Sequence, residues 1–116
     1  IKDRKGLENN SLYGGIFENW IISEIRKNRA NQGTHDGMYY FRDSAGNEID
    51  LLLESQEGLR AIEVKSSEKF KSDHFSGLRY WKKHTFNGNG LLVYGGKTSN
   101  DYEYPVLDWK EVGGIS

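Results

Sequence analysis

The sequence predicts a single α/β domain built on a mixed β-sheet. The first observation is the order of the patterns along the chain: helix, three short strands, helix, then two more strands. The second is that a helix separates the third and fourth strands, and such a crossover normally makes the strands on either side parallel. The third is size, because 116 residues suit one domain and 15 aromatic residues (3 Trp, 7 Tyr and 5 Phe) supply core material.

Each element has its own signal. Apolar residues recur at helical spacing after the Gly14-Gly15 pair, so we expect a first helix there. Turns rich in Gly, Asn, Asp and Ser separate the next three apolar runs, which indicates an antiparallel meander. Pro105 in the last run indicates an edge strand. The expected elements are a helix over 15–29, strands over 38–42, 48–54 and 59–66, a helix from Ser72, and strands over 91–94 and 102–109.

Composition narrows the class of protein. The chain has no cysteine, which excludes disulfides and thiolate metal sites and makes a reducing cytoplasm the expected location. No apolar run reaches the length of a membrane span, so we expect no membrane partner. The polar, aperiodic opening suggests that residues 1–12 are a linker or the end of an upstream region, and that the domain covers residues 13–116.

Three charged residues stand out on the second and third expected strands. Asp50 interrupts an otherwise apolar run, where an uncompensated carboxylate would be costly. Glu63 and Lys65 are two residues apart, so they project from one face of a strand, and a hairpin can bring Asp50 beside them. Two carboxylates and an ammonium suit a hard cation, Mg²⁺ or Mn²⁺, next to a phosphate. This pattern indicates a metal-dependent phosphodiesterase site.

Three short motifs, taken together in their order and spacing, resemble a known superfamily. They are Gly14-Gly15-Ile16-Phe17-Glu18, Gly46-Asn47-Glu48-Ile49-Asp50 and Ile62-Glu63-Val64-Lys65-Ser66. They resemble the PD-(D/E)xK restriction-endonuclease-like superfamily, and are most similar to an uncharacterised domain found C-terminal to prokaryotic AAA-type ATPase domains. The resemblance covers nearly the whole chain from Leu12 onward. It implies a three-layer sandwich with the order helix-strand-strand-strand-helix-strand and a final edge strand.

The resemblance also implies roles for individual residues. Asp50 and Glu63 would be metal ligands, with the Val64 carbonyl as a third. Glu18, on the first helix, would complete the metal shell. Lys65 would orient the attacking water and offset the charge that develops on phosphorus.

Simpler interpretations stand beside these roles. Asp50 can be a surface acid of its strand, and Glu18 a solvated residue at the margin of the helix. Glu63 can form an ion pair with Lys65 or Arg42. For Glu48 we expect an ion pair with Arg42 rather than metal ligation.

Two further sets of residues allow more than one interpretation. Glu24 lies near the middle of the apolar helix stripe, so it should pair with a buried base or face the site. Basic clusters can be ordinary solvated helix faces, or they can touch a nucleic-acid backbone. These clusters are Arg26, Lys27 and Arg29; Lys69 and Lys71; and Arg79, Lys82, Lys83 and His84.

Two functions follow as alternatives. In the first, the chain is a Mg²⁺-dependent nuclease that hydrolyses phosphodiester bonds in DNA and is linked to an upstream ATPase domain. In the second, it is a catalytically silent accessory module of an AAA-type ATPase that binds nucleic acid or protein, which the net charge of -1 favours. A homodimer through an exposed aromatic C-terminal strand carrying Tyr102, Tyr104 and Trp109 is compatible with both.

Overall fold

A computed structural model of the protein describes residues 11–33, 37–56, 58–69, 71–85 and 89–115. The linker expected over residues 1–12 therefore lies outside the described residues, apart from its last two. The elements are, in chain order, α2 (Ser11–Asn31), β1 (Met38–Arg42), β2 (Glu48–Ser55), β3 (Gly58–Val64), the 3₁₀ helix η1 (Ser72–Phe75), α3 (Ser76–His84), β4 (Gly90–Tyr94), β5 (Val106–Asp108) and the 3₁₀ helix η2 (Trp109–Gly114).

The five strands form one mixed sheet in the order β1-β2-β3-β4-β5. The first three strands are an antiparallel meander, as expected. The helical crossover through η1 and α3 then makes β4 parallel to β3, and β5 is parallel to β4. Both features follow from the order of patterns in the sequence, and so does the position of β5 at an edge of the described sheet, directly after Pro105.

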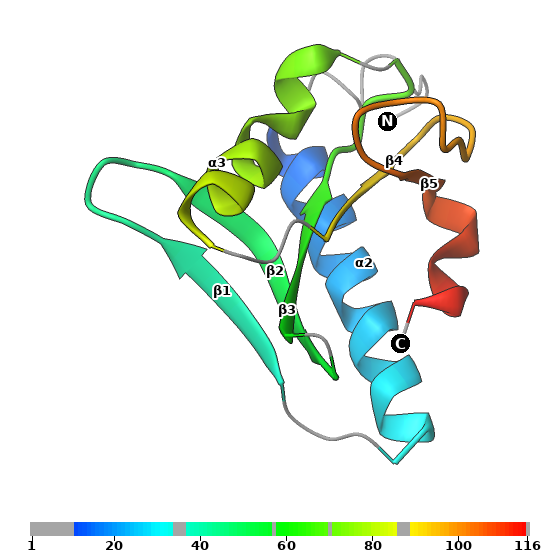
Figure 1. Ribbon diagram of the computed structural model, residues 1–116. Coiled ribbons are helices and arrows are strands. Elements are labelled where there is room, and N and C mark those ends of the chain that lie inside the picture. Colours follow the sequence, from blue (N-terminus) through cyan, green and yellow to red (C-terminus); the bar gives the residue numbers. More distant parts are fainter. Residues whose placement is uncertain (1–10, 34–36, 57, 70, 86–88, 116) are drawn as a thin grey trace.

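Helices cover both faces of the sheet, which explains why strands β2, β3 and β4 carry long apolar runs. Figure 1 shows α2 and the C-terminal η2 on one side and α3 on the other. The core under α2 contains Ile21, Ile25, Ile62 and Val93, among others. The core under α3 is built around Phe75 and Leu78 of the crossover. The molecule is thus a compact α/β domain with a separate apolar layer on each face.

Helix α2 is longer than the sequence predicts, because it begins at Ser11 and passes straight through Gly14-Gly15. Each glycine costs about 1 kcal/mol in a helix. Burial of Phe17 and Ile21 further along the same helix offsets this cost. A Cβ on Gly14 would lie 3.9 Å from Ser66 Oγ, so this end of α2 runs close to the segment that follows β3.

Strand β2 contains a β-bulge next to Asp50. Its pairing with β1 shifts by one residue between Tyr39 and Phe41. Leu51 packs in the core under α2, whereas Ile49, two residues earlier, packs in the core under α3. In a regular strand these two side chains would share a face. The bulge therefore changes which side of the sheet each residue before Leu51 faces.

The aromatic C-terminal strand expected over 102–109 is much shorter than predicted. Only Val106–Asp108 pair as β5, and Trp109 begins η2. Tyr104 is 4 % exposed, with its ring centroid 5.3 Å from that of Phe75. Its role in an exposed dimer surface was therefore a wrong prediction, because the loop before β5 folds Tyr104 into the core under α3.

Candidate functional site

The predicted site residues meet where β2 and β3 separate. The two strands pair regularly from Ser55↔Gly58 as far as Leu51↔Ile62. The next pair would be Asp50 and Glu63, but the strands diverge there. We call this point of divergence the fork. Backbone N–H groups inside a protein need hydrogen-bond acceptors, so those at the fork require acceptors other than the paired strand's backbone. Side-chain carboxylates take over this task.

The two carboxylates bridge the fork in opposite directions. The Val64 N–H donates to Asp50 Oδ2 over 2.8 Å, and the Asp50 N–H donates to Glu63 Oε1 over 3.4 Å. Each acid thus accepts from the backbone of the opposite strand. Lys65 Nζ lies 3.9 Å from Glu63 Oε2, which places an ammonium beside the pair. The structure therefore brings Asp50, Glu63 and Lys65 together, as the hairpin argument predicts.

Burial and the neighbouring Asp50 charge make Glu63 and Glu18 reluctant to ionise. Glu63 is 5 % exposed, and its burial, followed by the charge of Asp50, raises its pKa from 4.5 to about 8. Glu18, on α2, has its pKa raised to about 7 by burial, by the Asp50 charge and by a hydrogen bond with Asp50. The Lys65 ammonium lowers both pKa values, although it does not cancel these effects.

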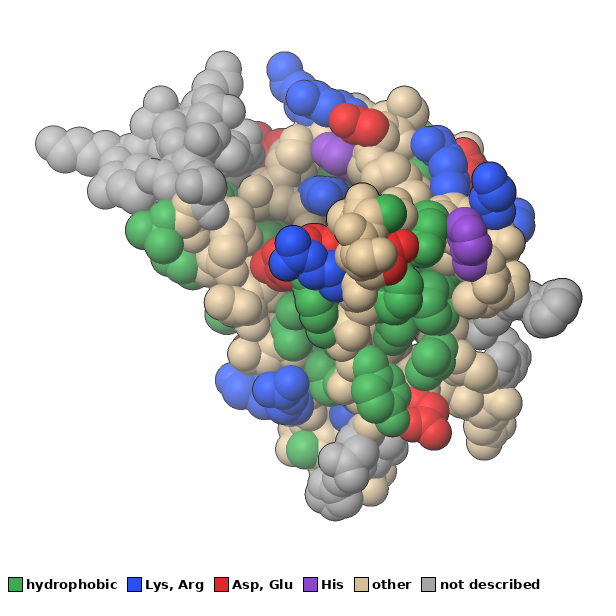
Figure 2. Space-filling view, turned by 90° about the vertical axis from the view of Figure 1, so that its left-hand side faces the viewer, with side chains coloured by type: hydrophobic (Ala, Val, Ile, Leu, Met, Phe, Trp, Pro, Cys, Tyr) green, Lys and Arg blue, Asp and Glu red, His purple; other side chains and the backbone are tan. Residues whose placement is uncertain are grey.

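A pocket of about 240 Å³ opens onto the fork. It lies beside the β1–β2 turn, on the side of the molecule that Figure 2 shows, where acidic and basic side chains gather near the centre of the surface. Glu18 does not line this pocket and approaches Asp50 from α2. The lining residues are Gly46, Asn47, Glu48, Asp50, Glu63, Lys65, Ser76 and Gly77.

Gly77 allows α3 to approach this fork closely. A Cβ at this position would lie 2.6 Å from Glu63 Oε1 and 2.9 Å from the Glu48 carbonyl oxygen. Real Cβ atoms do not come so near to other atoms, so only glycine fits without displacing a strand or the acid. The first turn of α3 therefore forms one wall of the pocket.

Comparison with protein-family models matches residues 13–111 to DUF4143, a domain of unknown function. The chain belongs to the DUF4143 family. No curated protein matches the sequence. In the described part of this DUF4143 domain, no helix combines the length and the hydropathy that a bilayer-spanning segment needs.

Several other charged residues of the DUF4143 domain have partners within the protein. Arg42 Nε lies 3.6 Å from Glu48 Oε1, which confirms the predicted ion pair. The prediction that Glu24 pairs with a buried base or faces the site is wrong. Glu24 instead pairs with Lys27, one turn along α2, at 3.3 Å. Arg29 does not offer a solvated basic surface, since it is buried and donates to the Glu54 carbonyl over 3.2 Å.

The donor set of the fork fits a hard cation. All its ligating atoms are oxygens, which Mg²⁺ and Mn²⁺ prefer. Two acids that resist ionisation would lose their protons more readily beside a cation. Among the described residues, however, no group of three or more His, Asp or Glu side chains is arranged to hold a metal ion. Val64 contacts Asp50 through its N–H, so its carbonyl role stays a prediction.

The sequence did not identify two residues that support the pocket, Gly77 and Asp43. Gly77 offered a signal, because glycine in the first turn of a helix often marks a close approach. Asp43 looked like an ordinary turn former. Its carboxylate accepts from the Ala45 and Asn47 N–H groups at 3.0 and 2.9 Å, and from the Tyr80 hydroxyl at 2.6 Å. Asp43 thereby fastens the β1–β2 turn, and with it one wall of the pocket, to α3.

Proposed function

We propose that this DUF4143 domain is a Mg²⁺-dependent nuclease that hydrolyses phosphodiester bonds in DNA. The observation that carries the proposal is the fork, where the Asp50 and Glu63 carboxylates bridge two strands with the Lys65 ammonium 3.9 Å from Glu63. The resemblance to the PD-(D/E)xK superfamily supports it, because the same residues occupy that superfamily's motif. On this proposal, the two helical layers and the sheet between them correspond to the three-layer sandwich of that superfamily.

Asp50, Glu63, Glu18 and the Val64 carbonyl would hold the cation. When bound, the ion would polarise the phosphate and make a water molecule more acidic. The raised pKa values of Glu63 and Glu18 imply that each carboxyl holds a proton over much of the neutral range, so binding of a cation has to release protons. Cation binding should therefore strengthen as the pH rises.

Lys65 has a separate task in this mechanism. Its side chain is partly exposed, so the ammonium can reach a phosphate in the pocket while it stays near Glu63. A compact ammonium with three donors suits orientation of a water molecule and compensation of charge on phosphorus. Gly77 and Ser76 shape the opposite wall and limit how a strand of DNA can approach.

A cleavage assay tests the proposal directly. The purified chain is incubated with supercoiled, linear, branched and single-stranded DNA, and with RNA, in Mg²⁺ or Mn²⁺ and in EDTA. We expect divalent-dependent cleavage of DNA, which falls by on the order of 100-fold or more in Asp50→Ala and Lys65→Ala. Lys97→Ala, which changes an exposed lysine outside the pocket and outside the basic clusters, should cleave like the wild type. Intact substrates under every condition would refute an enzymatic role.

The second candidate function is a catalytically silent accessory module of an AAA-type ATPase. DUF4143 domains are often found after AAA ATPases, and the net charge of -1 suits protein contact better than duplex binding. A thermal-shift titration separates the candidates without any cleavage. A metal-binding fork should raise the melting temperature in Mg²⁺ or Mn²⁺, and Asp50→Asn should abolish the rise. Absence of any shift in the wild type would favour the accessory module.

A further inference from the structure

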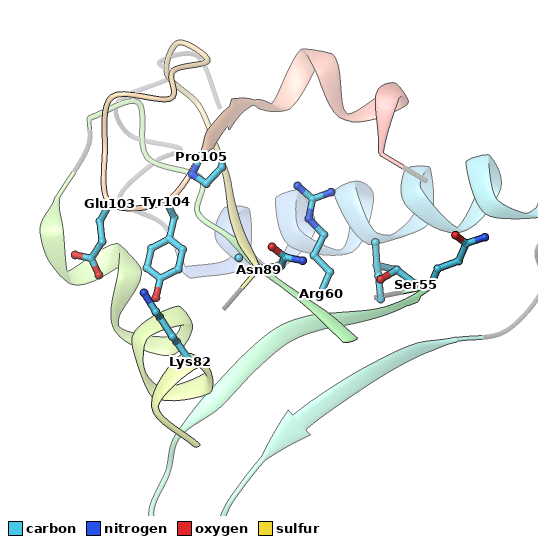
Figure 3. A pocket seen from close by; sticks show the side chains of 10 residues that line it. Ser55, Arg60, Lys82, Asn89, Glu103, Tyr104 and Pro105 are labelled. Carbon is cyan, nitrogen blue, oxygen red and sulfur yellow. The ribbon is translucent and has the colours of Figure 1, made fainter. Parts of the chain in front are cut away.

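A second, larger pocket lies at the other end of the sheet. Its volume is about 590 Å³, and it shares no lining residue with the pocket at the fork. The pocket exists because β4 begins at Gly90, opposite Ala61, so the first residues of β3 extend beyond their neighbour. Figure 3 shows the result, with side chains from β3, α3 and the segment before β5 around one space. The lining residues are Leu53, Ser55, Gln56, Arg60, Lys82, Asn89, Gly90, Glu103, Tyr104 and Pro105.

The described residues that line this pocket carry two positive charges, on Arg60 and Lys82, and one negative charge, on Glu103. Arg60 is half-buried, and neither it nor Lys82 forms an ion pair or a hydrogen bond with any described residue. The one acid among the described lining residues, Glu103, is held by Arg79, whose Nε and Nη2 donate to its two oxygens over 2.8 and 2.9 Å; the Lys82 charge acts on the same carboxylate at longer range. Arg60 and the exposed Lys82 thus place two positive charges at one pocket without a close ion pair to any described residue, which suits an anionic ligand.

The arrangement favours a ligand with more than one negative group. In Figure 3, Arg60 reaches the pocket from β3 and Lys82 from α3, Asn89 lies between them, and Tyr104 lies beside Lys82. Arg60 offers a planar fork of donors that matches two phosphate oxygens, and Lys82 offers a compact ammonium. Tyr104 is packed against Phe75, so its ring is not a free platform for stacking a base. Recognition would therefore depend on phosphates rather than on bases.

We propose that this pocket binds a phosphate-bearing polyanion, with Arg60 and Lys82 each contacting a different phosphate group. The proposal is independent of cleavage at the fork, because none of its contacts involves the acids there. Two sources share this chemistry: the backbone of a nucleic-acid strand and a free nucleoside triphosphate. They differ in length, which a binding experiment can resolve.

Binding is measured with the full chain in EDTA, so that cleavage plays no part. One arm uses fluorescence anisotropy with a labelled single-stranded oligonucleotide at several salt concentrations. The other arm uses calorimetric titration with ATP, and with inorganic phosphate as the minimal anion. The variants are Arg60→Gln and Lys82→Gln. Lys83→Gln is the matched control, since it removes the same charge from the next position of α3 without lining the pocket.

We expect Arg60→Gln and Lys82→Gln each to weaken binding by about 10-fold and to lower the salt dependence by about one phosphate contact, while Lys83→Gln changes affinity by less than about twofold. Loss in the oligonucleotide arm alone identifies a strand as the ligand, and loss in the ATP arm identifies a nucleotide. Equal effects of all three variants, or no binding in either arm, would overturn the proposal. Because binding is measured in EDTA and without any cleavage, failure of the nuclease proposal would not be mistaken for failure of this one.

Discussion

Replacement of Glu63 with Gln should stabilise the protein in mildly alkaline solution and change little in acid. The fold raises the pKa of Glu63 from 4.5 to about 8, through burial and then the Asp50 charge. A carboxyl whose pKa is higher in the folded chain than in the unfolded one contributes fully below the unfolded value, and this contribution is lost as the pH rises through the folded pKa. An amide in the same place keeps an oxygen for the Asp50 N–H and has no proton to lose.

The size of this stabilisation follows from the difference between the unfolded and folded pKa values of Glu63. At about 1.4 kcal/mol for each pH unit, the range from 4.5 to about 8 sets an upper limit of about 5 kcal/mol. Water entry and relaxation of the fork reduce this value, so we expect Glu63→Gln to gain about 2–4 kcal/mol above pH 8. For a domain of 116 residues this corresponds to roughly 6–15 °C in melting temperature.

Thermal unfolding in EDTA, followed by circular dichroism from about pH 5 to about pH 8.5, measures the difference between variant and wild type. The raised pKa of Glu18 makes stability fall with rising pH in both the variant and the wild type. The difference between the two stability curves therefore reports on Glu63. Glu24→Gln is the control, because Glu24 forms its ion pair with the exposed Lys27, away from the fork, and the variant should follow the wild-type curve. If the curves of Glu63→Gln and wild type run parallel, the fold does not raise the pKa of Glu63 and the reasoning is wrong.

Two further predictions concern packing. Gly77→Ala places a Cβ 2.6 Å from Glu63 Oε1 and should lower the free energy of unfolding in urea by about 1–2 kcal/mol, after the gain in helix propensity. Gly113→Ala has open space around its Cβ and should stay within about 0.5 kcal/mol of the wild type, so equal losses would contradict the crowding argument. Tyr104→Ala should cost about 3–5 kcal/mol in the same assay, whereas Tyr102→Ala, at a position 42 % exposed, should cost less than about 1 kcal/mol. A mild effect of Tyr104→Ala would argue against its burial.

Much of the fold was predictable because its signals are local. The meander follows from turn residues between short apolar runs, and the parallel pair follows from the helical crossover. The start of α2 was not predictable in this way, since Gly14 and Gly15 look like a break. Their helical conformation depends on the burial of Phe17 further along, which is a tertiary effect. Tyr104 was misplaced for a similar reason: the alternation of aromatic residues does not reveal which loop folds over a core.

The site was predictable as a set of residues but not as a geometry. A two-residue period correctly places Glu63 and Lys65 together. The same period cannot anticipate the bulge in β2, nor the exchange of backbone carbonyls for carboxylates at the fork. The two-residue period also could not identify Asp43 and Gly77. Asp43 fixes the β1–β2 turn, and Gly77 lets α3 approach the fork because it has no side chain. Such contributions depend on neighbours that are distant in the sequence.

The extra residue in β2 also bears on how this domain tolerates changes in chain length. Removal of one residue at the bulge, with Asp50 retained, would restore a regular ladder and turn the start of the strand over, so that apolar and acidic side chains exchange sides. A change of length inside the turn at 44–46 would leave the strand's facing intact. Alignments of related sequences should therefore admit gaps in the turn and none in the strand. A one-residue gap near Asp50 would mark a chain in which the acid no longer reaches Val64.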